Sequence, residues 1–410
     1  MFYLRTVLAA LMLSALMPLA AMAQGDSYSE RYNLDIHMGG FMDRLYNVLT
    51  DPKYGCAKYP EVPEVAGLLK QLGYFELENV QCEYAVQDGE VALRWATHFD
   101  GLDPQSYFGQ VFALPNKPLE LATYVPDDAL LYVGMNNVPQ QALLAVRELG
   151  AVAAAAQGEG SGLGEMFQDA DLAQVLGMLE AFDVEGQVNQ VLTGEVGLAM
   201  FAAPSIEKIS SGDFGPQDID AALLIGVKDA ARIKQLIGMA GANAQLTSMG
   251  EMAGGWSGWY ISMPEAAGAG IMMNDKLMFV APNVQNAVAH LDFSGAGQTT
   301  PDCQSYMDIN LTRLHDELAG PGLSMLMGEA PVDLAHAREA ANYLFALPPS
   351  DALGHVRAVT VYDSGYECAL TMNTALANYL FYYVGVGAAG MAASEMEKKD
   401  EAGAGEEGGE

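Results

Sequence analysis

Short apolar segments joined in pairs by tight-turn residues constrain this chain most. Residues 80–86 and 90–97 flank Gln87-Asp88-Gly89, and residues 356–362 and 366–372 flank Asp363-Ser364-Gly365. Aspartate and glycine are typical of the short loops that join antiparallel strands. Strand pairs of this kind predict antiparallel sheets, with helices elsewhere in the chain covering a face of each sheet.

A second pattern is a strand, a proline and a helix that recur in the same order. Residues 129–137 form an apolar run, and Pro139 opens a helical pattern that Gly150 can end. The same order recurs at residues 322–328 and Pro331. We therefore predict an α+β fold in which antiparallel sheets are each covered by helices, with a weak internal duplication.

The remaining apolar and helical patterns complete the prediction. Further strands are expected at residues 194–201, 219–227, 259–263, 270–273 and 277–280, helices at 63–72, 230–240, 284–291 and 332–347, and a mobile loop at 151–164.

Turn-rich and glycine-rich stretches at residues 102–118 and 293–301 are candidate boundaries between units. The predicted organisation is a signal peptide at residues 1–23, an N-terminal helix and hairpin segment at 24–118, a first α+β unit at 119–292, a second α+β unit at 293–394 and a disordered acidic tail at 395–410.

The N-terminal segment has the three parts of a secretory signal peptide. Arg5 precedes an uncharged run at residues 6–17, and Ala21-Met22-Ala23 supplies the small residues of a cleavage site. The alternative is an uncleaved anchor, but this run is shorter than the roughly 20 residues that a spanning helix needs. We expect cleavage after Ala23 and a periplasmic or extracellular location.

The other end of the chain leaves two interpretations open. No charged residue occurs between Glu367 and Glu395, and residues 375–393 are long enough to span a membrane. Asn378 and three tyrosines within that segment favour a buried terminal helix of a soluble protein instead. We expect the soluble helix and keep a C-terminal transmembrane helix as the alternative.

The charge balance excludes one class of partner. The chain has 52 acidic and 19 basic side chains and a formal net charge of −33, so a basic nucleic-acid-binding module is excluded. At 51% hydrophobic residues the chain can bury a sizeable core.

Four cysteines remain after the predicted export, namely Cys56, Cys82, Cys303 and Cys368. An even number in an oxidising compartment predicts two disulfides, although three pairings are formally allowed. We expect Cys56–Cys82 and Cys303–Cys368, because each pair falls within one predicted unit. Buried free thiols are the alternative.

Metal-binding patterns are lacking. The six histidines form no H-x-x-H or H-E-x-x-H spacing, and no C-x-x-C occurs. His315-Asp316-Glu317 is adjacent in sequence, but neighbouring side chains on a helix point in different directions. Asp213, Asp218 and Asp220 lack the spacing of a calcium loop and are expected to be ordinary loop residues. No metal or cofactor is predicted.

Catalytic motifs are equally lacking. Neither a G-x-S-x-G elbow nor a G-x-x-x-x-G-K phosphate loop is present, so no catalytic residue is assigned. Trp256, Trp259 and Tyr260 form an aromatic cluster that could contact a sugar or a partner, but packing within the core is the preferred interpretation. The 23 methionines are also expected to pack in cores.

Three segments resemble a class of exported bacterial proteins catalogued only as a domain of unknown function. They are residues 126–133 (PDDALLYV), 192–199 (LTGEVGLA) and 221–229 (AALLIGVKD). The resemblance covers roughly residues 119–290, and its motifs are turns and strand starts. It implies bacterial export and an α+β arrangement, and it assigns no catalytic residue.

The sequence therefore predicts an exported, non-catalytic protein that binds a component of the cell envelope or a ligand. The alternatives are a secreted hydrolase that uses carboxylates, and a scaffold tethered to the membrane by the C-terminal helix. An unidentified envelope protein or ligand is the expected partner, and nucleic acid is not.

Overall fold

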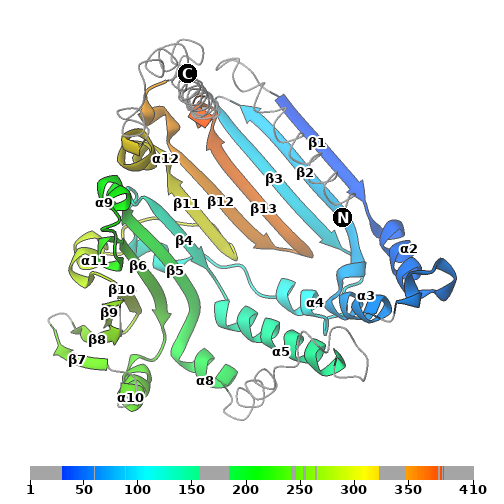
Figure 1. Cartoon of the computed structure of the whole chain (residues 1–410), viewed down its shortest axis with the longest axis horizontal. Coiled ribbons are helices and arrows are strands. Elements are labelled where there is room, and N and C mark those ends of the chain that lie inside the picture. The colour runs from blue at the N-terminus through cyan, green and yellow to red at the C-terminus, as the bar shows by residue number, and fades with distance from the viewer. Residues whose placement is uncertain are drawn as a thin grey trace, which may run out of the picture.

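The computed structural model contains one 13-stranded sheet in which every strand is antiparallel to its neighbours (Figure 1). It describes residues 30–59, 61–87, 89–156, 184–241, 246–252, 255–263, 266–322, 348–376, 379–380 and 382. Across the sheet the strands are β1 (Glu30–His37), β2 (Leu77–Gln87), β3 (Glu90–Phe99), β13 (Gly365–Asn373), β12 (His355–Tyr362), β11 (Ser305–Asn310), β4 (Leu131–Met135), β5 (Leu192–Ala202), β6 (Asp220–Val227), β10 (Leu277–Ala281), β9 (Ala266–Met273), β8 (Ser257–Met263) and β7 (Leu246–Glu251).

The prediction of several antiparallel sheets, each covered by helices, is wrong. Strand β13 pairs with β3, and β11 pairs with β4, so strands from all three predicted folded units are hydrogen-bonded into one sheet. The strand order β13-β12-β11-β4-β5-β6 shows that the last predicted unit joins the first half of the middle unit where β11 pairs with β4. Joining the strands in one sheet leaves fewer edges with unpaired backbone groups than separate small sheets would. Turn residues in the sequence indicate hairpins, but they do not indicate which hairpins lie side by side.

The hairpins themselves are confirmed. Strands β2 and β3 are joined through Gly89, whose φ of 82° is a left-handed conformation that suits glycine. Strands β12 and β13 are joined through Asp363 and Ser364, and Ser364 also has a positive φ, 53°. The meander at β8, β9 and β10 is confirmed as well.

The described helices lie around the ends and sides of the sheet (Figure 1). They are α2 (Gly39–Thr50), α3 (Glu61–Leu72), α4 (Tyr107–Phe112), α5 (Val138–Ala156), α8 (Val184–Val191), α9 (Ile206–Ser211), α10 (Ala230–Gly241), α11 (Val284–His290) and α12 (Leu311–Leu314). Asp229 accepts a hydrogen bond from the Arg232 backbone N–H at 3.0 Å and so caps α10, the helix predicted at residues 230–240.

Two local predictions are corrected by the structure. Helix α5 continues through Gly150 to Ala156, because residues 151–156 are almost all alanine, the strongest helix former. The mobile loop predicted to start at residue 151 is therefore wrong over residues 151–156.

Several predictions fall outside the described residues. These are the signal peptide at residues 1–23, the tail at 395–410, residues 157–164 of the predicted loop, most of the strand and helix at 322–347, and most of the apolar segment at 375–393. In the part of the chain that the structure describes, no helix is both long and apolar enough for a membrane crossing.

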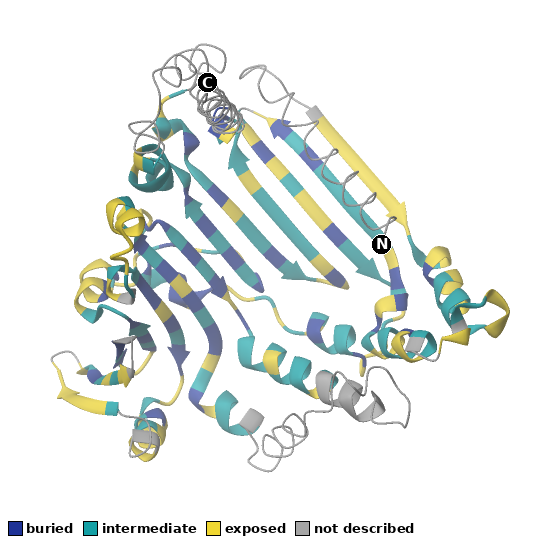
Figure 2. Cartoon of the chain, viewed as in Figure 1, coloured by how far each residue is buried: buried dark blue, intermediate teal, exposed yellow. Residues whose placement is uncertain are grey.

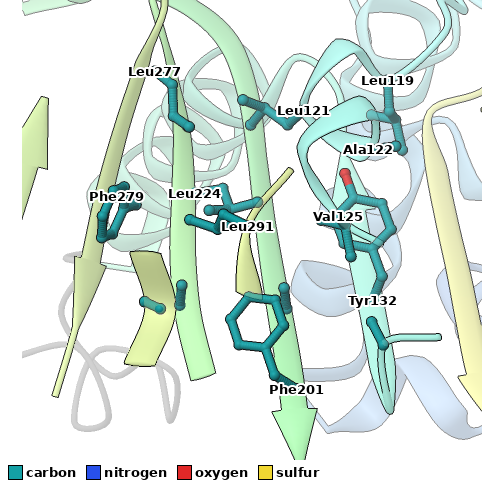
Figure 3. Packing of buried hydrophobic residues seen from close by; sticks show 14 of the residues in the cluster. Leu119, Leu121, Ala122, Val125, Tyr132, Phe201, Leu224, Leu277, Phe279 and Leu291 are labelled. Atoms are coloured by element: carbon teal, nitrogen blue, oxygen red, sulfur yellow. The ribbon is translucent and has the colours of Figure 1, made fainter. Parts of the chain in front are cut away.

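The largest core lies against one face of the strands from β4 to β10 (Figure 3). A short 3-10 helix, η4 (Glu120–Tyr124), packs on β4, β5 and β6, and α11 packs beside it on β6, β9 and β10. Buried side chains include Tyr132, Phe201, Leu224, Leu277 and Phe279. A continuous apolar core therefore packs against this half of the sheet.

Candidate functional site

The other half of the sheet has a face made almost entirely of apolar side chains. Side chains alternate between the two faces of a strand, so residues opposite one another in the register share a face. Three rows run across β1, β2, β3 and β13, and we call these twelve residues the Trp95 face. The rows are Tyr32–Tyr84–Leu93–Leu370, Leu34–Cys82–Trp95–Cys368 and Ile36–Val80–Thr97–Tyr366.

Five large side chains of the Trp95 face are exposed. They are Tyr32, Leu34 and Ile36 on the edge strand, Trp95 on β3 and Tyr366 on β13. Trp95 is 39% exposed although its strand has neighbours on both sides. The edge strand β1 is exposed from Arg31 to His37 (Figure 2). A group of exposed apolar side chains in a folded protein marks a surface that contacts another molecule.

The opposite face of the same strands is charged, in what we call the ionic stripe. Arg94 on β3 makes a bidentate pair with Glu367 on β13, with donor–acceptor distances of 2.6 and 2.7 Å. Arg94 also lies 3.8 Å from Glu83 on β2, and Glu83 contacts Arg31 on β1. Pairing with Glu367 raises the pKa of Arg94, and the same contact lowers the pKa of Glu367. These strands therefore have one face suited to water and one suited to an apolar partner.

A buried carboxylate joins β11 to β12. Asp308 is 5% exposed and accepts hydrogen bonds from His355 Nδ1 at 2.7 Å and from Arg357 Nε at 3.2 Å. The Tyr306 hydroxyl lies 3.5 Å from the same carboxylate, and burial, together with the charge of Asp308, raises the pKa of Tyr306 to about 12. An Asp–His pair can orient a catalytic base, but among the described residues no Ser, Thr or Cys side chain is bonded to His355. His355 and Arg357 thus satisfy the hydrogen bonding of a buried carboxylate.

A second buried carboxylate fixes helix η4. Glu195 on β5 accepts the backbone N–H groups of Leu121 at 2.7 Å and Glu120 at 3.0 Å. These N–H groups belong to the first turn of η4 and have no partner within the helix. Burial raises the pKa of Glu195 to about 7, although both hydrogen bonds favour its charged form. Nearby, the Tyr132 hydroxyl is buried without a hydrogen-bond partner within the described chain, and burial raises its pKa.

The predicted disulfides are not formed, and all four cysteines are free thiols. Cys303 and Cys368 are separated by β12, because the Gln304 backbone N–H bonds to the Thr360 carbonyl and Thr360 pairs with Cys368. Two strand spacings, about 10 Å, exceed the reach of a disulfide. Cys56 lies in a 3-10 turn (Cys56–Lys58), and Cys82 lies in the middle of β2.

The acidic residues singled out in the sequence bind different partners. His315 Nδ1 bonds to Asp316 at 2.9 Å, whereas Glu317 accepts the Arg313 guanidinium and, at 2.9 Å, the Ala203 backbone N–H. Of the three aspartates expected in a loop, Asp218 contacts Lys208, whereas Asp220 is the first residue of β6 and lies 3.1 Å from His290. Within the described ranges, no three His, Cys, Asp or Glu side chains are placed to hold a metal ion.

The aromatic cluster around residue 259 is mainly part of the core, as preferred from the sequence. The Trp256 ring packs edge-on against Phe279 and Phe293, with centroid distances of 5.7 and 5.2 Å. Trp259 packs in a smaller cluster with Ile233 and Met273. Tyr260 is exposed. The exposed tryptophan is therefore Trp95, which the sequence interpretation did not single out.

Sequence reasoning missed the Trp95 face because its residues come from three separate parts of the chain. Alternation within residues 80–86 and 90–97 shows that each strand has an apolar side. It does not show that β1 pairs with β2 and that β13 pairs with β3, so that the apolar side continues onto both neighbouring strands.

Comparisons with known proteins place the chain in no family. No family model matches it, and no curated protein is found to be similar. Among solved structures, crystal form I of TP0453 matches with a TM-score of 0.26 and 10% identity, and crystal form III with 0.28 and 9%. Each match covers 65% of this chain and 98% of the other. At these scores the likeness carries no argument about function.

Proposed function

We propose that this is an exported, non-catalytic protein that binds an apolar component of the cell envelope, one that carries an acyl chain, at the Trp95 face. The observation that carries the proposal is the set of five exposed large side chains on one face of β1, β3 and β13, including Trp95 well inside the sheet. Export rests on the N-terminal pattern of Arg5, an apolar run and Ala21-Met22-Ala23.

The two-sided character of these strands supports an apolar ligand over a polar one. Trp95, Leu34 and Tyr366 offer hydrocarbon and aromatic surface, while the side chains of the ionic stripe point to the other side of the same strands. An acyl chain needs no directional hydrogen bonds, so a flat apolar face can bind it by removing its surface from water.

The test is binding of dansyl-undecanoic acid to the mature protein, followed by energy transfer from tryptophan to the dansyl group. We expect saturable binding that Tyr366→Ala weakens by about fivefold, which corresponds to about 1 kcal/mol of lost apolar contact. Thr371→Ala is the matched control, because Thr371 is an exposed residue of β13 that alternates onto the ionic-stripe side. Equal affinities of the two variants, or the lack of saturable binding, would refute the proposal.

A further inference from the structure

Among the described residues, strand β1 is an edge of the sheet that lacks two common forms of protection. It has eight residues, and its register with β2 is regular from Glu30 to His37. Every residue from Arg31 to His37 is exposed. The opposite edge strand, β7, has six residues and an irregular register between Ser248 and Gly250. Bulges and short lengths prevent edge strands from pairing with other chains, and β1 has neither.

The free side of β1 presents a set of backbone groups ready for pairing. The Met38 backbone N–H bonds to the Glu78 carbonyl at 2.7 Å, which shows that even-numbered residues of this segment point their backbone groups toward β2. Because the direction alternates, Arg31, Asn33 and Asp35 point their N–H and C=O groups outward. Within the chain as described, the outward groups of these three residues have no hydrogen-bond partner.

The side chains of β1 complement a second copy of the same strand. Arg31 and Asp35 lie two residues before and after Asn33, on the same face. If two copies pair antiparallel about a two-fold axis at Asn33, each Arg31 lies opposite Asp35 of the partner subunit. On the other face, each Tyr32 lies opposite Leu34 of the partner subunit, so two exposed apolar side chains meet.

This register also extends the ionic stripe. Within one chain the stripe alternates in sign from Glu367 through Arg94 and Glu83 to Arg31. The next position across the axis would be the partner's Asp35, which continues the alternation. A neighbouring two-fold register, centred on Leu34, would place Arg31 opposite His37 of the partner subunit. It would place no acidic side chain of β1 opposite a basic one.

We propose that two copies of this chain associate through β1, antiparallel and with the two-fold axis at Asn33, to form one sheet that runs across both subunits. Arg31, Asn33 and Asp35 of each subunit exchange backbone hydrogen bonds with their counterparts, about six in all. The partner is therefore a second copy of the chain, recognised through edge pairing and the two Arg31–Asp35 contacts.

The test is sedimentation equilibrium of the mature protein at about 150 mM NaCl, where the Debye length of about 8 Å screens the long-range repulsion between two acidic subunits. We expect a monomer–dimer equilibrium. Arg31→Asp and Asp35→Arg should each raise the dissociation constant at least tenfold, and the double variant should return it to within about threefold of the parent. Thermal melting of each variant checks that the subunit itself stays folded.

A crosslink fixes the register independently. Asn33→Cys should give a disulfide-linked dimer on mild oxidation, because the two copies of this residue face each other at the axis. Tyr32→Cys should not, because Tyr32 faces Leu34 of the partner subunit, and its neighbour on β2 is Tyr84, which carries no thiol. A monomer at all concentrations, single variants that leave the dissociation constant unchanged, or crosslinking by Tyr32→Cys in place of Asn33→Cys would each overturn the proposal.

Discussion

Gly134 on β4 lies directly opposite Gly197 on β5, and the ring of Tyr132 fills the space above both. A Cβ atom at Gly197 would lie 2.9 Å from Tyr132 Cε2, and one at Gly134 would lie 2.7 Å from Leu119 Cδ1. Both distances are shorter than van der Waals contact. The absence of two side chains therefore allows Tyr132, the largest fully buried side chain of the described residues, to lie against the sheet.

Gly197→Ala should lower the free energy of unfolding by about 1–3 kcal/mol, because the new methyl group forces Tyr132 out of its position. Urea denaturation measures the change. Gly238→Ala is the control, since Gly238 lies in α10 with open space around its Cα and an alanine there should stabilise the helix by about 0.5–1 kcal/mol. Equal effects of the two substitutions would argue against close packing of Tyr132 on Gly197.

The carboxylate of Glu195 should make stability depend on pH. Its pKa is about 7 in the folded protein and near 4.5 when the chain is unfolded, so between these values the folded state binds the additional proton. Stability should therefore fall as the pH rises from about 4.5 to about 7, by roughly 3 kcal/mol from this group, and change no further above that range.

Urea denaturation at pH 5 and pH 8 tests this dependence with Glu195→Gln. The glutamine does not titrate, so the variant should lose less stability than the parent between the two pH values. Its single oxygen accepts only one of the two N–H groups of η4, so we also expect a cost of about 1 kcal/mol at pH 5. Glu207→Gln, at an exposed position on α9, should leave the pH dependence unchanged. A slope unaffected by Glu195→Gln would contradict the assignment.

Removal of the two basic side chains around Asp308 should destabilise the fold more than removal of the carboxylate. His355 and Arg357 have side-chain exposures of 26% and 53%, so water can solvate them when Asp308 is replaced by alanine. Asp308 itself is buried, and His355→Ala together with Arg357→Ala would leave it with only the distant Tyr306 hydroxyl, at a cost of about 3 kcal/mol. Thermal denaturation ranks the two variants, and the reverse order would show that loss of Asp308 carries the larger penalty.

The hairpins show what could be predicted from this sequence. Residues 356–362 and 366–372 alternate around Asp363-Ser364-Gly365, and the structure has β12 and β13 at those places, because local turn chemistry and alternation suffice to specify a hairpin. Strand β11 was missed although it lies in the middle of the sheet. Its buried face carries Asp308, whose partners His355 and Arg357 are distant in the sequence, and Asn310, whose side chain caps α12, so no apolar run marks it.

The Trp95 face could not be predicted from the strands alone, because it forms only when particular strands lie side by side in the sheet. Cys82, Trp95 and Cys368 lie side by side only because β13 pairs with β3, a contact between residues more than two hundred positions apart. The alternation in each strand indicates an apolar side, but the order of strands sets which sides combine. The same order separates Cys303 from Cys368, whose pairing had been predicted from their position within one unit.

The thiols should differ in accessibility. Cys303 is fully buried, and burial raises its pKa to about 11, whereas Cys56, Cys82 and Cys368 are half-exposed. Iodoacetamide at pH 8 should therefore label three cysteines in the folded protein and the fourth only in urea, with labelled peptides identified by mass spectrometry. Two cysteines that remain unlabelled in urea without reductant would indicate a disulfide.

Fluorescence of Trp95 alone tests the central claim most directly. The variant Trp256→Phe/Trp259→Phe leaves Trp95 as the only tryptophan, since the chain has three. Addition of undecanoic acid to this folded variant should shift the Trp95 emission to shorter wavelength in a saturable manner, because the exposed ring loses contact with water. An emission maximum that stays unchanged at every ligand concentration would contradict binding at the Trp95 face.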